Sequence, residues 1–405
     1  MGRIRDFFRM WSRDKPKNYT GDYIGSIGYY YGVSTSGKLV TPYNAMQLTA
    51  VYACIRIIAE TVASLPLNVF KYAEDGKEKA YDHPLYKILH DEPNDEMSSM
   101  TFRETLMHHI LTTGNAYAQI VRNGYGRVVA LYPLLPNKMV VERSTKNKKI
   151  YYKYSTDTEG QVVLSKDEVL HIPGLGFDGI IGYSPIAMCR NSIGLSMAAD
   201  NFGSSFFENG ARPTGVLEHP GQLKEPEKVR DAWERTYGSG AHRTAVLEEG
   251  MKYQQISISP DEAQFLETRK FQVNEICRIF RVPPHMVADL EKSSFSNIEQ
   301  QSLDFVQNTI TPWLVRIEQN MQRQLLTTEE KNSIFIKHNV NGLLRGDFNT
   351  RMNGYAVGRQ NGWYSVNDIR EMEDMNRIPA EEGGDDYLCN GNMTKLRDAG
   401  NWNKE

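Results

Sequence analysis

Two glycine-rich segments are the parts of this 405-residue chain most similar to ligand-binding motifs. Gly32–Leu39 is similar to a phosphate-binding P-loop, but Leu39 replaces the Ser or Thr whose hydroxyl binds Mg²⁺ in that motif. Thr41-Pro42 follows at the point where the motif requires a helix. Gly174–Gly179 matches G-x-G-x-x-G after a strand, but the next helix signal comes only at Pro185. A lone match of this kind is weak, so we expect a strand-to-helix loop rather than a nucleotide site.

The histidines are the other residues that could act as ligands or general bases. His108 and His109 are adjacent, and His83 and His90 are seven residues apart, but no Cys/His spacing of a metal site occurs. The sequence has no G-x-S-x-G motif, and no carboxylate pair stands out from the solvated charges. We therefore expect structural histidines, no catalytic residues, no metal and no cofactor. An α/β enzyme that uses the 174–182 loop or the histidines is kept as an alternative.

The composition is typical of a folded chain with several domains, since 40% of the residues are apolar and 24% are charged. Fifty acids against 47 bases give a net charge of −3, which argues against tight, histone-like wrapping of nucleic acid. The four cysteines are scattered, which indicates a reducing compartment. No apolar run approaches the ~20 residues of a membrane span, and charges fill Met1–Lys17. We expect a soluble, intracellular protein with no membrane partner.

Residues 1–41 are interpreted as an N-terminal arm. Ile4, Phe7, Phe8 and Trp11 make one apolar stripe on a short, arginine-rich helix. This pattern favours packing on the same protein or on a neighbouring copy over docking to a membrane surface.

An α/β region follows the arm. Apolar residues keep helical spacing from Leu48 to Leu65 and stop at Pro66, and a T-x-x-E capping box at Thr101 predicts a second helix that ends at Gly114. Up to His171 the sequence predicts a small mixed sheet with helices. The expected strands are Leu67–Tyr72, Ala116–Arg122, Arg127–Tyr132, Ile150–Tyr154 and Gln161–Leu164, with turns at Asn123-Gly124 and Gly160.

Two long helices are predicted next. Ser184 and Pro185 start the first, which meets no stop before Asn209-Gly210 and would be ~36 Å long at 1.5 Å per residue. The second starts at the capping box Ser259–Glu262 and is halted by Pro283-Pro284. Both helices are long enough to hold the segment between them well away from the α/β region.

Small residues line one side of the first long helix. They are Ser192, Ser196, Ala199 and Gly203, which recur at helical spacing. Such a stripe lets another backbone approach closely, and we expect it to pack against another helix.

The remaining elements are predicted from the spacing of apolar residues and from capping and helix-breaking residues. The segment between the two helices has a helix at Pro226–Tyr237 and a strand at Thr244–Leu247. A third long helix runs from about residue 297 to residue 326, with a kink expected at Pro312. After a strand at Ile334–His338, the tail has two short helices, the second capped by Ser365 with Asp368 and stopped near Pro379.

The chain resembles the portal, or head-to-tail connector, proteins of tailed double-stranded DNA bacteriophages over roughly Leu48–Asp386. The resemblance rests on short motifs in combination: Val51–Arg56 through Leu65-Pro-Leu67, His83-Pro-Leu85, Gly114-Asn-Ala-Tyr117, Gly182-Tyr-Ser-Pro185, Phe206–Pro213, Asp261–Gln264 with Glu267 and Arg269, Arg281-Val-Pro-Pro284, Ser296–Glu299, Asn367–Arg370 and Gly383-Gly-Asp385. Two departures occur. Asp368 stands where the family usually has Glu, and Met286–Asp289 lacks an expected Gly.

The resemblance implies an α+β, portal-type fold that assembles as a ring, twelve-membered in the phage head. Its parts would be a mixed α/β wing at 42–183, two long antiparallel stem helices at 184–210 and 259–282, and a small α/β clip at 211–258. A channel loop would follow at 283–297, then the long helix and return strand of the wing at 298–345, and a helical crown at 346–405. In such a ring the stripe Ser192, Ser196, Ala199 and Gly203 would pack between subunits.

The implied function is the DNA channel at one capsid vertex of the virion, assembled in the cytoplasm of the host bacterium. The terminase large subunit would pump DNA inward, a head-tail adaptor protein would later bind the clip, and the major capsid or scaffolding protein would surround the ring. Lys292, Ser293 and Ser294 would face the DNA, and Glu227, Asp231 and Glu234 would form the partner surface of the clip. A capsid-associated structural protein that passes no DNA is a third interpretation.

Overall fold

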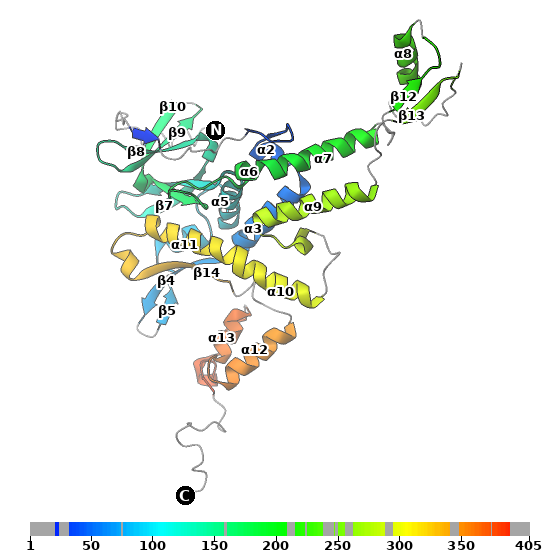
Figure 1. Cartoon of the computed structure of the whole chain (residues 1–405). Coiled ribbons are helices and arrows are strands. Elements are labelled where there is room, and N and C mark those ends of the chain that lie inside the picture. Colours follow the sequence, from blue (N-terminus) through cyan, green and yellow to red (C-terminus); the bar gives the residue numbers. More distant parts are fainter. Residues whose placement is uncertain are drawn as a thin grey trace. The chain divides into compact units, whose positions relative to one another are not determined.

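The computed structural model of the chain describes residues 21–23, 32–73, 76–157, 160–208, 215–222, 225–237, 247, 250–255, 262–287, 295–340, 348–373 and 375–388. The chain divides into two compact units, residues 1–339 and residues 340–405 (Figure 1). Several predictions fall outside the described residues. These are the arm stripe from Ile4 to Trp11, the capping box that starts at Ser259, and the channel-loop residues Lys292, Ser293 and Ser294.

Two helices packed on each other form the centre of the first unit, α3 (Thr49–Ser64) and α5 (Ser99–Thr113). The predicted apolar stripe of α3 is fully buried, with Val51, Ile58 and Val62 each 0% exposed. The helix ends before Pro66, as predicted. Burial of this stripe stabilises the core, since each fully buried Val or Ile contributes roughly 1.5–3 kcal/mol.

The predicted C-terminal end of α5 is confirmed, whereas the predicted N-terminal end is wrong. Gly114, left-handed at φ 85°, ends the helix as expected. The start was placed three residues too late, because the N-cap is Ser98 and not Thr101. The Ser98 hydroxyl accepts the N–H of Thr101, so the predicted capping residue already lies inside the helix.

The strands of the first unit form several separate antiparallel sheets, so the single mixed sheet expected from the sequence is wrong. Both predicted hairpin turns, at Asn123-Gly124 and at Gly160, are present. Tight turns pair each strand with its neighbour in the chain, which favours small antiparallel sheets. The four-stranded sheet has the spatial order β1 (Gly21–Tyr23), β8 (Met139–Ser144), β9 (Ile150–Thr156) and β10 (Gly160–Ser165). Two three-stranded sheets have the orders β11 (Val169–Pro173), β6 (Asn115–Arg122), β7 (Val128–Leu134) and β14 (Ile334–His338), β4 (Leu67–Ala73), β5 (Gly76–Lys79). A two-stranded sheet pairs β2 (Gly32–Val33) with β3 (Leu39–Val40).

The first long helix begins at Ser184 and Pro185 as predicted, but it is broken at Cys189. Helix α6 (Pro185–Met188) is followed by α7 (Arg190–Glu208), and the second long helix is α9 (Glu262–Phe280). Helices α7 and α9 have 19 residues each, ~28 Å of rise, and lie side by side (Figure 1). Short helices α2 (Pro42–Ala45) and α4 (Pro84–His90) complete this part of the unit.

The third long helix is interrupted just before the expected kink. Helix α10 (Phe295–Phe305) passes through a π-helical turn at Val306–Ile310 into α11 (Thr311–Leu325). Pro312 lies in the first turn of α11, and because it has no N–H it cannot bond back to the π-helical turn that precedes it. Before it, the N–H and the hydroxyl of Thr311 both donate to the carbonyl of Val306, so the chain bonds five residues back instead of four.

The segment between α7 and α9 contains the predicted helix, α8 (Pro226–Tyr237), with unchanged bounds. The strand predicted at Thr244–Leu247 lies outside the described residues except for Leu247, which is not in a strand. The strands of this segment are β12 (Gly215–Glu218) and β13 (Lys252–Gln255), an antiparallel pair that the sequence analysis did not identify.

The second unit contains α12 (Phe348–Gln360) and α13 (Val366–Met372). The predicted capping box is confirmed, since Ser365 accepts the N–H of Asp368 and the Asp368 carboxylate accepts the N–H of Ser365. Helix α13 ends at Met372, well before the stop expected near Pro379.

Candidate functional site

Two glycine motifs meet where the first long helix leaves the α/β region. Asn115 donates to the carbonyl of Gly182 at 2.9 Å and accepts its N–H at 2.8 Å, and the Ser184 hydroxyl donates to the carbonyl of Thr112 at 2.7 Å. A Cβ on Gly182 would lie 2.0 Å from the carbonyl oxygen of Gly114, so no side chain fits there. These contacts fix the position at which α6 and α7 start.

His171 contacts the Asn115 side chain of this junction. Its Nε2 lies 3.1 Å from Asn115 Oδ1 and its Nδ1 lies 3.3 Å from the Tyr152 hydroxyl. The side chain is buried, and burial lowers the pKa of His171 to about 3, so the ring stays neutral at physiological pH. A neutral, fully packed histidine of this kind is structural.

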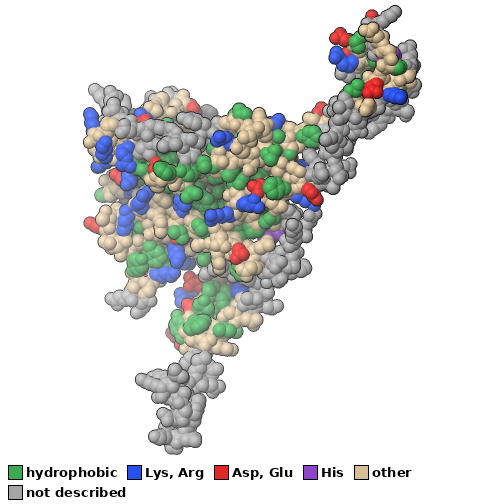
Figure 2. Space-filling model, viewed as in Figure 1, with side chains coloured by type: hydrophobic (Ala, Val, Ile, Leu, Met, Phe, Trp, Pro, Cys, Tyr) green, Lys and Arg blue, Asp and Glu red, His purple; other side chains and the backbone are tan. Residues whose placement is uncertain are grey.

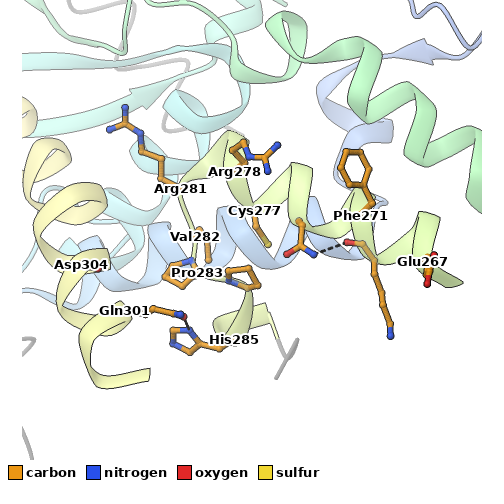
Figure 3. A pocket seen from close by; sticks show the side chains of 13 residues that line it. Glu267, Phe271, Cys277, Arg278, Arg281, Val282, Pro283, His285, Gln301 and Asp304 are labelled. Atoms are coloured by element: carbon orange, nitrogen blue, oxygen red, sulfur yellow. Dashed lines mark hydrogen bonds between the residues drawn. The ribbon is translucent and has the colours of Figure 1, made fainter. Parts of the chain in front are cut away.

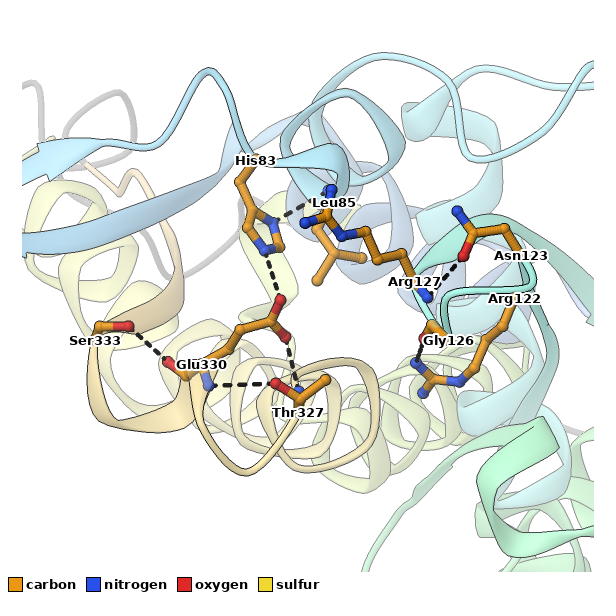
Figure 4. A network of polar contacts seen from close by, with 9 residues as sticks. All are labelled: His83, Leu85, Arg122, Asn123, Gly126, Arg127, Thr327, Glu330 and Ser333. Atoms are coloured by element: carbon orange, nitrogen blue, oxygen red, sulfur yellow. Dashed lines mark hydrogen bonds and ion pairs between the residues drawn. The ribbon is translucent and has the colours of Figure 1, made fainter.

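A second network ties α4 to the turn after α11 (Figure 4). His83 caps α4 by accepting the Leu85 N–H through Nδ1, and its Nε2 lies 3.2 Å from the carboxylate of Glu330. The other oxygen of Glu330 accepts the N–H of Thr327 at 2.8 Å. The motif His83-Pro-Leu85 therefore holds together segments that are 247 residues apart in the chain.

The remaining histidine candidates are not arranged for metal binding. The Nδ1 atom of His90 lies 2.7 Å from the carboxylate of the adjacent Asp91. Burial, together with a smaller effect of the neighbouring His108, lowers the pKa of His109 to about 4. Across the described ranges, no three His, Cys, Asp or Glu side chains come close enough together to hold a metal ion.

The 174–182 loop is closed on itself. The N–H groups of Ile180 and Ile181 both donate to the Asp178 carboxylate, and those of Gly174 and Tyr183 donate to the carbonyls of Gly114 and Leu175. A phosphate-binding loop needs such N–H groups free for the ligand. The strand before the loop, β11, also lies in an antiparallel sheet, whereas a dinucleotide site needs a parallel βαβ unit.

The P-loop-like segment 32–39 is a hairpin packed on α7. In its turn, the N–H of Lys38 donates to the Ser34 hydroxyl and the N–H of Gly37 donates to the Ser34 carbonyl. The N–H of Thr35 donates to the side-chain oxygen of Asn191 in α7. A Cβ on Gly194 would lie 2.2 Å from the Ser34 hydroxyl, so the hairpin and the helix are in close contact. The segment therefore has a structural role in covering the start of α7.

Helices α7 and α9 are antiparallel. Asp200, about midway along α7, pairs at 2.9 Å with Arg269, about midway along α9, and the two ribbons run in opposite directions in Figure 1. Further along, α9 packs on α3, where Cys54 and Cys277 are both buried and reduced. A hydrogen bond with Cys277, followed by burial, raises the pKa of the Cys54 thiol well above its ordinary value, so this pair is chemically inert packing.

The predicted small stripe lies partly inside the single chain. Ser196 and Gly203 are already buried within the subunit, whereas Ser192 and Ala199 are half-buried. Small residues therefore let α7 approach other segments of its own chain. Packing of Ser192 and Ala199 against a neighbouring subunit stays a prediction.

The outer face of the same helix is apolar and was missed in the sequence analysis. Leu195 and Phe202 are 51% and 53% exposed, and Phe271 of α9 is 60% exposed. The seven-residue spacing of Met188, Leu195 and Phe202 was the available signal, because residues seven apart share one side of a helix. Large apolar side chains exposed in a row indicate a surface that another protein covers.

A groove of about 1030 Å³ lies beside α9, from Glu267 to Arg278, and the C-terminal half of α10 (Figure 3). His285 and Gln301 face each other across it at 2.7 Å, and the Thr309 hydroxyl donates to the carbonyl of Arg281 at 2.7 Å. These two bonds join the segment that enters the predicted channel loop to the helix that leaves it. The base of the loop is therefore fixed.

The turn at the end of α9 is a Schellman motif with an unusual residue. The N–H of Val282 donates to the carbonyl of Cys277, and that of Arg281 donates to the carbonyl of Arg278. Arg281 has φ 56°, a left-handed conformation that costs an L-residue roughly 1–2 kcal/mol. Pro283-Pro284 follow at once, so the helix cannot continue, as the sequence predicted.

Residues 49–374 match the family model described as phage portal protein. The chain belongs to the phage portal protein family. It is 39% identical to the "probable portal protein" of Streptomyces phage phiC31 over 375 residues, covering 88% of this chain and 81% of that protein. It is 35% identical to the portal protein of Enterobacteria phage HK97 over 369 residues, covering 89% of this chain and 85% of that protein.

The fold agrees with this assignment. A chain in the neck of a native gene transfer agent particle, a structure with C12 symmetry, superposes with a TM-score of 0.55 at 20% identity, covering 86% of this chain and 99% of that one. The predicted α+β portal fold, with two long antiparallel helices and a small α/β segment between them, is confirmed.

The portal motifs of the second unit meet in one network. Asn367, 1% exposed, accepts the N–H of Ile378 at 2.7 Å and donates to the Ile378 carbonyl and the Asp385 carboxylate, each at 2.8 Å. Its own N–H donates to Gly384, where a Cβ would lie 2.4 Å from the Ile378 carbonyl. The motifs Asn367–Arg370 and Gly383-Gly-Asp385 are therefore two halves of one packing site.

The predicted partner surface of this portal protein lies on α8. Glu227 and Asp231 are exposed and four residues apart, so they share one face of the helix. Glu234 follows in the same helix, and its side chain lies outside the described residues. The helices that the structure describes include none long and apolar enough to cross a bilayer.

Proposed function

We propose that this chain forms the ring-shaped DNA channel at one capsid vertex, through which the genome enters the head and later leaves into the tail. The observation that carries the proposal is the match to portal proteins over most of the chain, including 39% identity to the phiC31 protein. The C12 symmetry of the neck that contains a similar chain supports a ring of twelve. A ring of this kind is part of the virion and assembles in the host cytoplasm.

We propose the following parts of the ring. We assign residues 42–183 and 298–345 to the wing, residues 184–210 and 259–282, which contain α7 and α9, to the stem, residues 211–258 to the clip, residues 283–297 to the channel loop and residues 346–405 to the crown. The fixed base of the loop, at His285–Gln301 and Arg281–Thr309, supports this assignment, because a loop that contacts moving DNA needs a rigid mounting. Lys292, Ser293 and Ser294 would face the DNA.

The proposed role is mechanical and not enzymatic. The N–H groups of Gly174, Ile180 and Ile181 in the 174–182 loop are bonded within the protein, and His83 and His171 belong to packing networks. These observations disfavour the alternative of an α/β enzyme. The third interpretation, a capsid-associated protein that passes no DNA, differs from a portal in having no axial channel.

Native mass measurement with negative-stain images of the purified full-length protein tests the proposal. One chain is 46.2 kDa, so a portal ring is expected on the order of half a megadalton, with an open axial channel. A particle of one or two chains would contradict the ring. A closed disc without a channel would favour the structural protein that passes no DNA.

The clip is expected to bind the terminase large subunit first and the adaptor protein later. Reversing Glu227 and Asp231 to Lys should leave ring mass and melting unchanged, because both side chains are exposed on α8. It should weaken binding of either partner by about an order of magnitude at low salt, since surface charges set encounter rates. The matched control is Asp82→Lys with Glu96→Lys, two exposed carboxylates outside the clip. Equal binding by both double variants would place the docking surface elsewhere.

A further inference from the structure

A strongly basic turn joins β8 and β9 at one end of the four-stranded sheet. Arg143, Lys146, Lys148 and Lys149 fall within seven residues, and no Asp or Glu occurs from residue 143 through residue 156. The whole chain carries a net charge of −3, so this is a local concentration of positive charge. Figure 2 shows Lys and Arg side chains gathered over the sheet that contains β8, β9 and β10.

The turn is an ordered structure. Ser144 donates to the carbonyl of Lys149, and Lys148 donates to the carbonyl of Ser144, both at 2.9 Å. The Arg143 guanidinium donates to the carbonyl of Lys148 at 2.8 Å, so Arg143 braces the turn. Lys148 itself has φ 58°, a conformation in which glycine or asparagine would be less strained. The backbone therefore presents the lysines at a fixed place.

The three lysines are available to a partner. Residues 145–149 are exposed, and in the part of the chain that the structure describes none of Lys146, Lys148 and Lys149 is paired with a carboxylate. Other lysines nearby are neutralised, since Lys153 of β9 pairs with Glu142 at 2.8 Å and Lys138, just before β8, pairs with Asp157 at 2.7 Å. The sheet thus has one neutral end and one end with uncompensated positive charge.

The chemistry of the turn favours a polyanion over a folded protein surface. Protein interfaces depend on buried aromatic or apolar anchors and are depleted in Lys, whereas this turn offers only Thr145, Asn147 and three ammonium groups. Closely spaced ammonium groups suit the evenly spaced phosphates of a duplex, and each contact releases condensed counterions. Ammonium groups on long, exposed side chains favour phosphate oxygens over base edges, so we expect binding that is largely independent of sequence.

We propose that the β8–β9 turn is a phosphate-binding surface that holds duplex DNA and is distinct from the proposed channel loop. Lys146, Lys148 and Lys149 make the contacts, and Arg143 positions them. The contact would anchor packaged DNA near the portal without reading its sequence. This proposal does not depend on passage of DNA through the ring.

The test uses relaxed, covalently closed circular duplex DNA, which has no end that could thread through a preformed ring. Binding of the full-length protein is measured by mobility shift from 50 to 200 mM NaCl. The variant is Lys146→Gln with Lys148→Asn and Lys149→Gln, where Asn tolerates the left-handed backbone at residue 148. If all three lysines contact phosphate, the slope of log K against log salt should fall by up to about 2.7 per bound subunit, because each contact accounts for ~0.9.

The control removes the same charge elsewhere through Lys87→Gln, Lys166→Gln and Lys337→Gln, three exposed lysines outside the turn. Weaker binding and a smaller salt slope in the turn variant alone would support the proposal. Equal binding by the two variants, or no binding of the circle by the parent protein, would overturn it. Loss of the ring in the turn variant alone would also overturn it, because the turn would then be a subunit interface. Parent binding to polyglutamate but not to DNA would assign the surface to an acidic protein instead.

Discussion

Replacing Gly182 with alanine is expected to prevent the subunit from folding stably. The added Cβ would lie 2.0 Å from the carbonyl oxygen of Gly114 and 2.4 Å from the N–H nitrogen of Gly174. Both neighbours are backbone atoms, so relief requires α6, β6 and β11 to move apart. We expect a loss of about 4 kcal/mol or more, a large fraction of the 5–15 kcal/mol that stabilises a typical domain.

The measurements are soluble yield and thermal melting of the full-length protein, where a drop of about 10 °C or more is expected. Gly124→Ala is the matched control, because a Cβ at that position meets no atom within 4 Å. The control should melt with the parent. If Gly182→Ala also melts with the parent, the junction between the glycine motifs does not fix the start of the first long helix.

Replacing Leu195 with glutamate is expected to abolish the ring while leaving the subunit folded. Leu195 is 51% exposed in the single chain, so its replacement removes few contacts within the subunit. The free energy of unfolding of the subunit should therefore change by less than about 0.5 kcal/mol. In a ring whose subunits meet through the outer face of α7, the carboxylate would be buried without a partner. That cost is several kcal/mol at each interface and is repeated around the ring.

Native mass separates these outcomes, with Asn201→Glu as a control of equal charge at an exposed polar position of the same helix. The control should keep its rings. Ala199→Phe tests the predicted small stripe in the same assay, since overpacking at an interface costs roughly 1–3 kcal/mol per site. Rings lost in Ala199→Phe but kept in Leu195→Glu would assign the interface to the stripe instead of the outer face.

The proposed channel loop and the basic turn differ in charge, which agrees with the different tasks proposed for them. Lys292 is the single base in the segment from Asp289 to Ser294, whereas the β8–β9 turn has four bases within seven residues. Few phosphate contacts let DNA slide with little salt-dependent trapping, and several contacts hold it. The proposed passage of DNA and the proposed retention of DNA therefore need separate surfaces.

Much of this architecture was determined by local sequence signals. The helices α3 and α8, the hairpin at Asn123-Gly124 and the cap at Ser365 all lie where period, turn residues and capping residues predict them. These features depend on residues within a few positions of one another, so the chain specifies them without reference to the rest of the fold. The family motifs, likewise, can be found by inspection of the sequence alone.

Only the tertiary structure decided which of those motifs belong together and which surfaces they leave exposed. The contact of Asn115 with Gly182 spans 67 residues, and that of His83 with Glu330 spans 247. The division of the strands into separate sheets, the burial of Ser196 and the exposure of Leu195 depend on such distant contacts. The physical reason is that a single amide, imidazole or small side chain is compatible with many partners, and close packing of the whole chain selects one of them.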